Sequence, residues 1–112
     1  MSTEGFDRSR RLSSVREIQA VARQGRRSRT PNLDISWLSN GLSHPRCGLV
    51  VPLHGATAVA RNKLRRQLRE IVRRRLLPEL EPIDLVLKPR PHAYKAEFAD
   101  LAVELEQWLH SH

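Results

Sequence analysis

The alternation of apolar and polar positions predicts three β-strands. Residues 33–37 (LDISW) alternate apolar and polar side chains, which is typical of a strand with one buried face. Residues 47–51 (CGLVV) and 83–87 (IDLVL) are short, mostly apolar runs, which predict two more buried strands. Ser39-Asn40-Gly41 predicts a turn after the first strand.

A first helix is predicted just before these strands. Ser14 and Glu17 have the spacing of a capping box, in which the two side chains satisfy free amides of the first helical turn. Gly25 is a natural terminator, and the basic run at residues 26–29 is predicted to be a loop. The apolar face of this helix comprises Val15, Ile18, Val21 and Ala22.

Two longer helices are predicted in the second half of the chain. One covers about residues 57–77, with Thr57 as N-cap and Pro78 as its limit. The other runs from about Tyr94 to His110. Its predicted core positions are Phe98, Leu101, Ala102, Leu105, Trp108 and Leu109.

This order of elements predicts an α+β fold, a mixed sheet with helices packed on it. The length of 112 residues suits one domain, and we expect a flexible tail at 1–10 and a single domain over 11–112. Cys47 is the only cysteine, which excludes a disulfide framework and fits the cytoplasm. With no signal-peptide pattern and no bilayer-spanning apolar run, the protein is expected to be soluble.

Charge is distributed unevenly along the chain. Lys and Arg number 20 against 12 Asp and Glu, a net charge of +8. Residues 61–75 contain eight basic side chains and one acidic one, whereas seven of the twelve acids follow residue 76. Concentrating like charge in one helix costs self-repulsion, which indicates a polyanionic partner. Nucleic acid is the favoured partner, and an anionic membrane surface or an acidic protein is the alternative.

The helix over 57–77 is predicted to be anchored on one side and basic on the other. Its apolar stripe comprises Ala60, Leu64, Leu68, Ile71 and Val72. Beside it lies an arc of Arg61, Asn62, Arg65, Arg66, Arg69 and Arg73, with Lys63 and Arg74 further round. Arginine can grip a phosphate with two hydrogen bonds. The alternative is a solvated helix face, but Glu70 is the only acid in this stretch that could form i,i+4 pairs.

No protein active site or metal site is predicted. The five histidines have no metal-ligand spacing, and the glycines form no phosphate-binding loop. Asp84 is expected alone in its strand, and Cys47 is expected to be a buried apolar residue. Glu97, Asp100, Glu104 and Glu106 are expected on the outer face of the last helix.

Residues 58–70 (AVARNKLRRQLRE) closely resemble the RNR signature of the bacterial ribonuclease P protein family. Supporting segments are Arg11-Leu12, residues 46–51 (RCGLVV), and residues 83–87 leading to Pro89-Arg90-Pro91. The resemblance therefore spans about residues 11–109. It implies a mixed sheet of about four strands with three helices, the basic helix lying in a βαβ crossover.

The resemblance also implies a function. The protein would be an accessory subunit of an endoribonuclease, binding ribonuclease P RNA and precursor tRNA, with no membrane and no obligate protein partner. The RNA and its Mg²⁺ would perform the hydrolysis. The RNA contacts that the resemblance implies are Arg61, Asn62, Lys63, Arg65, Arg66 and Arg69, and Arg73 of the arc is a further predicted contact. Candidates for binding the single-stranded 5′ leader, in a cleft between the first helix and the sheet, are Ile18, Ala22, Arg26, Arg27 and Trp37.

The chain departs from the family pattern at two places. Pro52, Leu53 and His54 stand where relatives usually carry a serine and lysines. Ile18 and Ala22 stand where relatives carry aromatic residues, so leader binding is expected to depend on arginine and backbone contacts. Two other functions remain open from the residues alone: an RNA-binding ribosomal protein or chaperone, and a DNA-binding protein.

Overall fold

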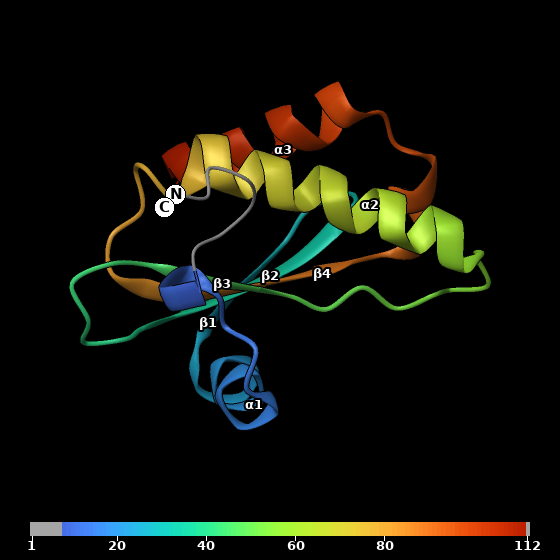
Figure 1. The fold of residues 1–112 in the computed structure, drawn as a ribbon. Coiled ribbons are helices and arrows are strands. Elements are labelled where there is room, and N and C mark those ends of the chain that lie inside the picture. The colour runs from blue at the N-terminus through green and yellow to red at the C-terminus, as the bar shows by residue number, and fades with distance from the viewer. Residues whose placement is uncertain (1–7, 112) are drawn as a thin grey trace.

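The protein is a four-stranded mixed sheet with helices on both faces (Figure 1). A computed structural model describes residues 8–111. The strands are β1 (Arg26–Arg29), β2 (Leu33–Ser39), β3 (Arg46–Leu49) and β4 (Ile83–Pro89), in the spatial order β1-β2-β4-β3. β2 is antiparallel to β1 and β4, whereas β3 is parallel to β4. The basic helix connects β3 to β4, which confirms the α+β class and the βαβ crossover.

Helices α2 and α3 cover one face of the sheet and α1 lies on the other (Figure 1). The helices are α1 (Val15–Gln24), α2 (Ala58–Ile71) and α3 (Phe98–Ser111). A π-helical turn, η2 (Val72–Leu76), extends α2, and short 3-10 helices form η1 (Arg8–Arg10) and η3 (Pro91–Lys95). Of the tail expected at 1–10, residues 1–7 lie outside the described residues. Within residues 8–111, no helix combines the length and apolar character that a membrane crossing needs.

The helix starts follow the predicted caps. Ser14 Oγ accepts a hydrogen bond of 3.3 Å from the amide of Glu17, and Thr57 Oγ1 accepts one of 3.1 Å from the amide of Ala60. The expected capping role of the Glu17 carboxylate is replaced by another contact, since it accepts a bond of 3.1 Å from Arg46 Nη2. Glu17 therefore ties α1 to β3.

Strand alternation divides the apolar residues into two clusters. Leu85 and Leu87 face α2 and α3, whereas Val86 faces α1. The buried stripe of α2, formed by Leu64, Leu68, Ile71 and Val72, is at most 3% exposed, as predicted, while Ala60 is only half-buried. The smaller cluster under α1 contains Leu12, Val21 and Val86. The large core thus fixes α2, and a thin layer holds α1.

Three predicted details are wrong. The run at 26–29 is not a loop but edge strand β1, which pairs with β2 from Arg26↔Trp37 to Arg29↔Asp34. Four polar side chains on an exposed edge have no apolar alternation that could identify them as a strand. The last helix begins at Phe98, because Tyr94 lies in η3 and its hydroxyl donates to the Pro52 carbonyl. Phe98, predicted to be in the core, is 38% exposed at the helix start.

Candidate nucleic-acid interface

The basic side of α2 is held in place by its buried side. Leu64 and Leu68 fix the rotation of the helix on the sheet, so that the arc predicted from the sequence faces outward. Arg61, Arg65 and Arg69, spaced at i,i+4, are half-buried, whereas Asn62, Lys63 and Arg66 are exposed. The Nε atoms of Arg61 and Arg65 are enclosed without a hydrogen-bond partner in residues 8–111. The arginine stems therefore lie along the protein surface.

The arginines of α2 and η2 fall into two groups. The front arginines, Arg61, Arg65, Arg66 and Arg69, form no ion pair with any described residue. The rear arginines, Arg73, Arg74 and Arg75, are all paired. Arg73 Nη2 donates to both Glu70 carboxylate oxygens at 2.9 Å, Arg74 also pairs with Glu70, and Arg75 pairs with Glu106.

These pairs have an electrostatic consequence. The hydrogen bond from Arg73, supported by the charge of Arg74, lowers the pKa of Glu70 below its ordinary value. Glu70 is thus charged at neutral pH and neutralises part of the rear group. The acidic helix α3 contributes Glu106 to Arg75, but in the described chain it does not reach the front arginines. The positive field of α2 is therefore concentrated between Arg61 and Arg69.

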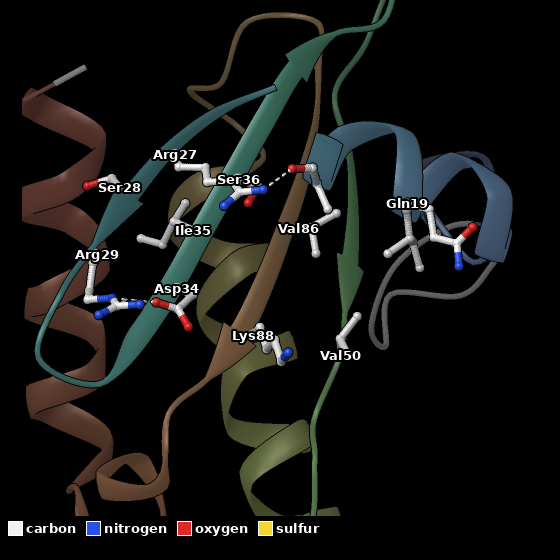
Figure 2. A pocket seen from close by; sticks show the side chains of 12 residues that line it. Gln19, Arg27, Ser28, Arg29, Asp34, Ile35, Ser36, Val50, Val86 and Lys88 are labelled. Atoms are coloured by element: carbon white, nitrogen blue, oxygen red, sulfur yellow. Dashed lines mark hydrogen bonds and ion pairs between the residues drawn. The ribbon is translucent and has the colours of Figure 1, made fainter. Parts of the chain in front are cut away.

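A second candidate surface is a cleft of about 580 Å³ between α1 and the sheet (Figure 2). Its apolar lining includes Ile18, Ala22, Val50 and Val86. Arg27, Arg29 and Lys88 bring positive charge to the cleft. Arg27 Nη2 donates to the Ala22 carbonyl at 2.5 Å, and Arg29 Nε pairs with Asp34 at 3.1 Å, whereas the Lys88 side chain forms no hydrogen bond or ion pair within residues 8–111. Lys88 is therefore the cleft cation most available to a ligand.

The structure separates the predicted leader-binding residues. Ile18, Ala22 and Arg27 line the cleft. Arg26 and Trp37 are cross-strand partners on the opposite face of the sheet, where the Arg26 guanidinium lies 5.7 Å from the Trp37 ring centroid. Trp37 also packs edge-on against Trp108, with ring centroids 5.2 Å apart. Trp37 is half-buried against the large core and lies outside the cleft, whose lining contains no aromatic side chain.

The expectation that Asp84 stands alone is wrong. Asp84 is 7% exposed, and its carboxylate accepts hydrogen bonds from Arg46 Nε at 2.8 Å and from Arg46 Nη2 at 2.7 Å. Asn40 Nδ2 also donates to Asp84 at 3.1 Å. The hydrogen bond to Asp84 is the main cause that raises the pKa of Arg46, which keeps this guanidinium charged. Asp84 and Arg46 therefore form a structural network under α1.

Glu104 and Cys47 both have structural contacts inside the protein. Glu104 is not on the outer face of α3, because its carboxylate accepts bonds from Thr30 Oγ1 and from the Asn32 amide at 2.9 Å. Cys47 is 2% exposed, and burial raises the pKa of its thiol, as suits an apolar core residue. In the described part of the chain, no three His, Cys, Asp or Glu side chains gather in a way that could hold a metal ion.

Sequence reasoning missed Lys88 as a cleft residue. In β4, Asp84, Val86 and Lys88 alternate with Leu85 and Leu87, so they share the α1 face. The period of two residues in the strand was the signal that could have identified Lys88.

Comparison with known proteins identifies relatives of the whole domain. The family model described as Ribonuclease P matches residues 6–112. The ribonuclease P protein component of Syntrophobacter fumaroxidans is 36% identical over 96 residues, which cover 85% of this chain and 81% of the relative. The component of Vibrio cholerae is 43% identical over 74 residues, covering 65% of this chain and 63% of the relative.

Solved structures of RNase P proteins have a fold similar to that of this chain. The RNase P protein from Thermotoga maritima matches with a TM-score of 0.81 and 26% identity, covering 91% of this chain and 96% of that chain. The Staphylococcus aureus RNase P protein matches with a TM-score of 0.81 and 21% identity, covering 91% of this chain and 94% of that chain. At this identity the match supports the fold alone.

Proposed function

The chain belongs to the ribonuclease P protein family and is a subunit of that ribonucleoprotein, and from this premise we propose how its two surfaces divide the work. The front arginines of α2, with Asn62 and Lys63, bind the RNA subunit. The cleft beneath α1 binds the 5′ leader of precursor tRNA. Because the chain belongs to this family, we prefer this function to the ribosomal-protein, chaperone and DNA-binding alternatives.

The observation that carries the first assignment is the lack of acidic partners for the front arginines. Four guanidinium groups stand on one rigid helix without an ion pair in residues 8–111. Such groups can each make charge-assisted bonds to phosphate oxygens. Binding then releases counterions from the RNA, which supplies most of the favourable free energy at low salt. Asn62 can donate to or accept from a ribose 2′-hydroxyl.

The second assignment rests on the composition of the cleft. Ile18, Ala22 and Val86 provide an apolar wall on which a base can lie, and Lys88 provides a cation for its phosphate. Without an aromatic side chain, the cleft lacks the stacking that contributes about 1–3 kcal/mol per base in other single-strand sites. We therefore expect the leader to be held mainly through its backbone, with little preference among bases.

The chemistry is assigned to the RNA. Among the acids of residues 8–111, Asp84 and Glu104 have the most protein hydrogen bonds, and they are bound by Arg46 and by Thr30 with Asn32 rather than directed to a shared site. We propose that Mg²⁺ is held by the RNA subunit and substrate, and that protein side chains alone bind none. The protein contributes positive charge where two polyanions must approach each other. Its place of action would be the cytoplasm.

Reconstitution tests this proposal. The purified chain is added to a ribonuclease P RNA at low magnesium, and the cleavage rate of a precursor tRNA is measured. We expect the wild-type chain and Arg16→Ala, a variant of an exposed α1 arginine outside both surfaces, to raise the rate equally. Arg65→Ala/Arg66→Ala should raise it much less. A wild-type chain that leaves the rate unchanged would refute the proposal.

A separate comparison tests the cleft. Lys88→Ala should raise the KM of a precursor with a leader of several nucleotides and leave kcat unchanged, because the lost contact is made equally in the ground state and the transition state. A precursor with a leader of one nucleotide serves as the matched substrate and should show no such change. If both substrates respond equally, Lys88 does not contact the leader.

A further inference from the structure

A smaller hollow of about 220 Å³ lies at the β3 edge of the sheet. It is lined by three arginines from two distant parts of the sequence: Arg11, and Arg65 with Arg69 of α2. Its remaining lining residues are Leu12, Ser13, Ile18, Cys47, Gly48 and Leu49. Arg11 has no role in the function proposed above, and the sequence pattern did not single it out as a binding residue.

The position of Arg11 is fixed by its neighbours. The Leu12 amide donates to the Cys47 carbonyl at 3.0 Å, and Arg11 forms a parallel bridge with Cys47. The Leu12 side chain is 3% exposed. A Cβ atom on Gly48 would lie 2.5 Å from the Leu12 carbonyl oxygen, so only glycine permits this close approach. The N-terminal segment is therefore held along β3, and Arg11 is carried to a defined place.

The three arginines of the hollow are electrostatically uncompensated. In residues 8–111, none of Arg11, Arg65 and Arg69 forms an ion pair. The floor contributed by Leu12, Cys47 and Leu49 is apolar and excludes water from below. Like charges brought together over an apolar floor repel one another, and an anion in the hollow would remove that repulsion.

The hollow also connects the two surfaces already described. β3 is an edge strand with α2 on one side of the sheet and α1 on the other, and the N-terminal segment runs beside it between the two helices (Figure 1). Arg65 and Arg69 belong to the front arginines, while Ile18 lines both the hollow and the cleft beneath α1. A chain passing from one surface to the other around this edge would cross the hollow.

We propose that this hollow is a third RNA-binding site, which takes a phosphodiester group of a strand crossing the β3 edge between the α2 face and the α1 cleft. The inference rests on the function proposed above. Arg11 and Arg69 grip the phosphate from two sides, and the Ser13 hydroxyl is a further donor at the rim. The phosphodiester can belong to the RNA subunit or to the leader, which share this chemistry.

The test compares Arg11→Ala with Arg16→Ala, an exposed arginine that lines none of the three sites. Binding of ribonuclease P RNA to each variant, and binding of precursor tRNA to each assembled enzyme, are measured against salt concentration. Arg11→Ala should flatten the log-affinity against log-salt slope by somewhat under about one unit in one arm, because one counterion fewer is released. The arm that responds identifies the source of the phosphate. Arg16→Ala should change neither arm.

Two further variants keep the outcome decisive. Ser13→Glu places a negative charge at the rim without removing an arginine, and should weaken the same arm by about tenfold or more, equivalent to about 1.4 kcal/mol. Arg66→Ala tests the proposed function independently. If Arg66→Ala flattens the slope while Arg11→Ala and Ser13→Glu behave like Arg16→Ala, the third site is refuted and the function stands. If Arg66→Ala also has no effect, the function itself fails.

Discussion

The front and rear arginines of the basic helix have the same chemistry but different surroundings. Arg61, Arg65, Arg66 and Arg69 have no acidic partner in the described chain, whereas Arg73, Arg74 and Arg75 are paired with Glu70 and Glu106. A count of basic residues treats both groups alike. The helix therefore presents an unpaired basic surface along α2, whereas the arginines of η2 form ion pairs within the protein.

The position of a single acid produces most of this difference. Glu70 lies three and four residues before Arg73 and Arg74, the spacing at which helical side chains meet. It also lies four and five residues after Arg66 and Arg65, but the structure directs its carboxylate toward the rear group. The predicted contact Arg73 is therefore a weaker candidate for RNA binding than Arg66 or Arg69.

The largest effect is expected for the half-buried arginine that pairs with the buried Asp84 carboxylate. Arg46→Ala leaves the Asp84 carboxylate enclosed without its two strongest bonds, and should destabilise the protein by about 3–5 kcal/mol. Arg29→Ala is the matched control, since its pair with Asp34 is exposed and should contribute about 0–1 kcal/mol. Urea unfolding measures both. Equal losses would show that the Arg46 network is not structural.

The anchoring of both arginine groups depends on the apolar stripe. Leu68 is fully buried, so Leu68→Ala should cost about 2–5 kcal/mol of folding stability. Val59→Ala, at a position of α2 that is 78% exposed, should cost well under about 1 kcal/mol. Thermal unfolding of the two variants checks this. Similar melting temperatures for both would mean that α2 does not pack on the sheet as described.

Front and rear variants should differ in RNA binding. Arg65→Ala/Arg66→Ala should reduce the salt slope for ribonuclease P RNA by somewhat under about two units, because two phosphate contacts are lost. Arg74→Ala/Arg75→Ala should reduce it by less than about one unit, since these guanidinium groups are already paired. Filter binding between low and moderate salt gives both slopes. A larger loss of slope from the rear variant would show that the paired arginines, and not the front arginines, contact the RNA.

The smallest effect is expected when the rear group is released. Glu70→Gln frees Arg73 and Arg74, and should steepen the salt slope by less than about one unit. Protonation of Glu70 would likewise release Arg73 and Arg74. Because the hydrogen bond from Arg73 lowers the pKa of Glu70, these ion pairs are fully formed above the ordinary carboxyl pKa, and they are lost only as pH falls through the lowered pKa. RNA affinity of the wild type should then show no transition from Glu70 near neutral pH. Such a transition would contradict the assigned pairs.

Periodicity predicted most of the fold. The α2 stripe, the alternation of β2 and the caps at Ser14 and Thr57 follow from local patterns, and the structure has all of them. The signature in α2 also led to the family. These features are local in sequence, so a pattern within one element contains the information they need.

The features that prediction missed depend on contacts between distant segments. β1 exists because Arg26–Arg29 finds a partner in β2, and its own side chains show no strand pattern. Trp37 packs on Trp108 and so leaves the cleft, while Lys88 enters it by alternation along β4. The neutralisation of Arg75 by Glu106 joins two helices that no local pattern relates.

The most direct test locates the RNA relative to α2. Cys47 is buried and its thiol pKa is raised, so a single introduced cysteine can carry an iron chelate that cleaves nearby RNA strands. Val59→Cys lies on the exposed side of α2, one turn from Lys63, and Val103→Cys lies on the exposed side of α3. We expect strong, localised cleavage of ribonuclease P RNA from position 59 and much weaker cleavage from position 103. Equal or stronger cleavage from position 103 would contradict the binding of this RNA by α2.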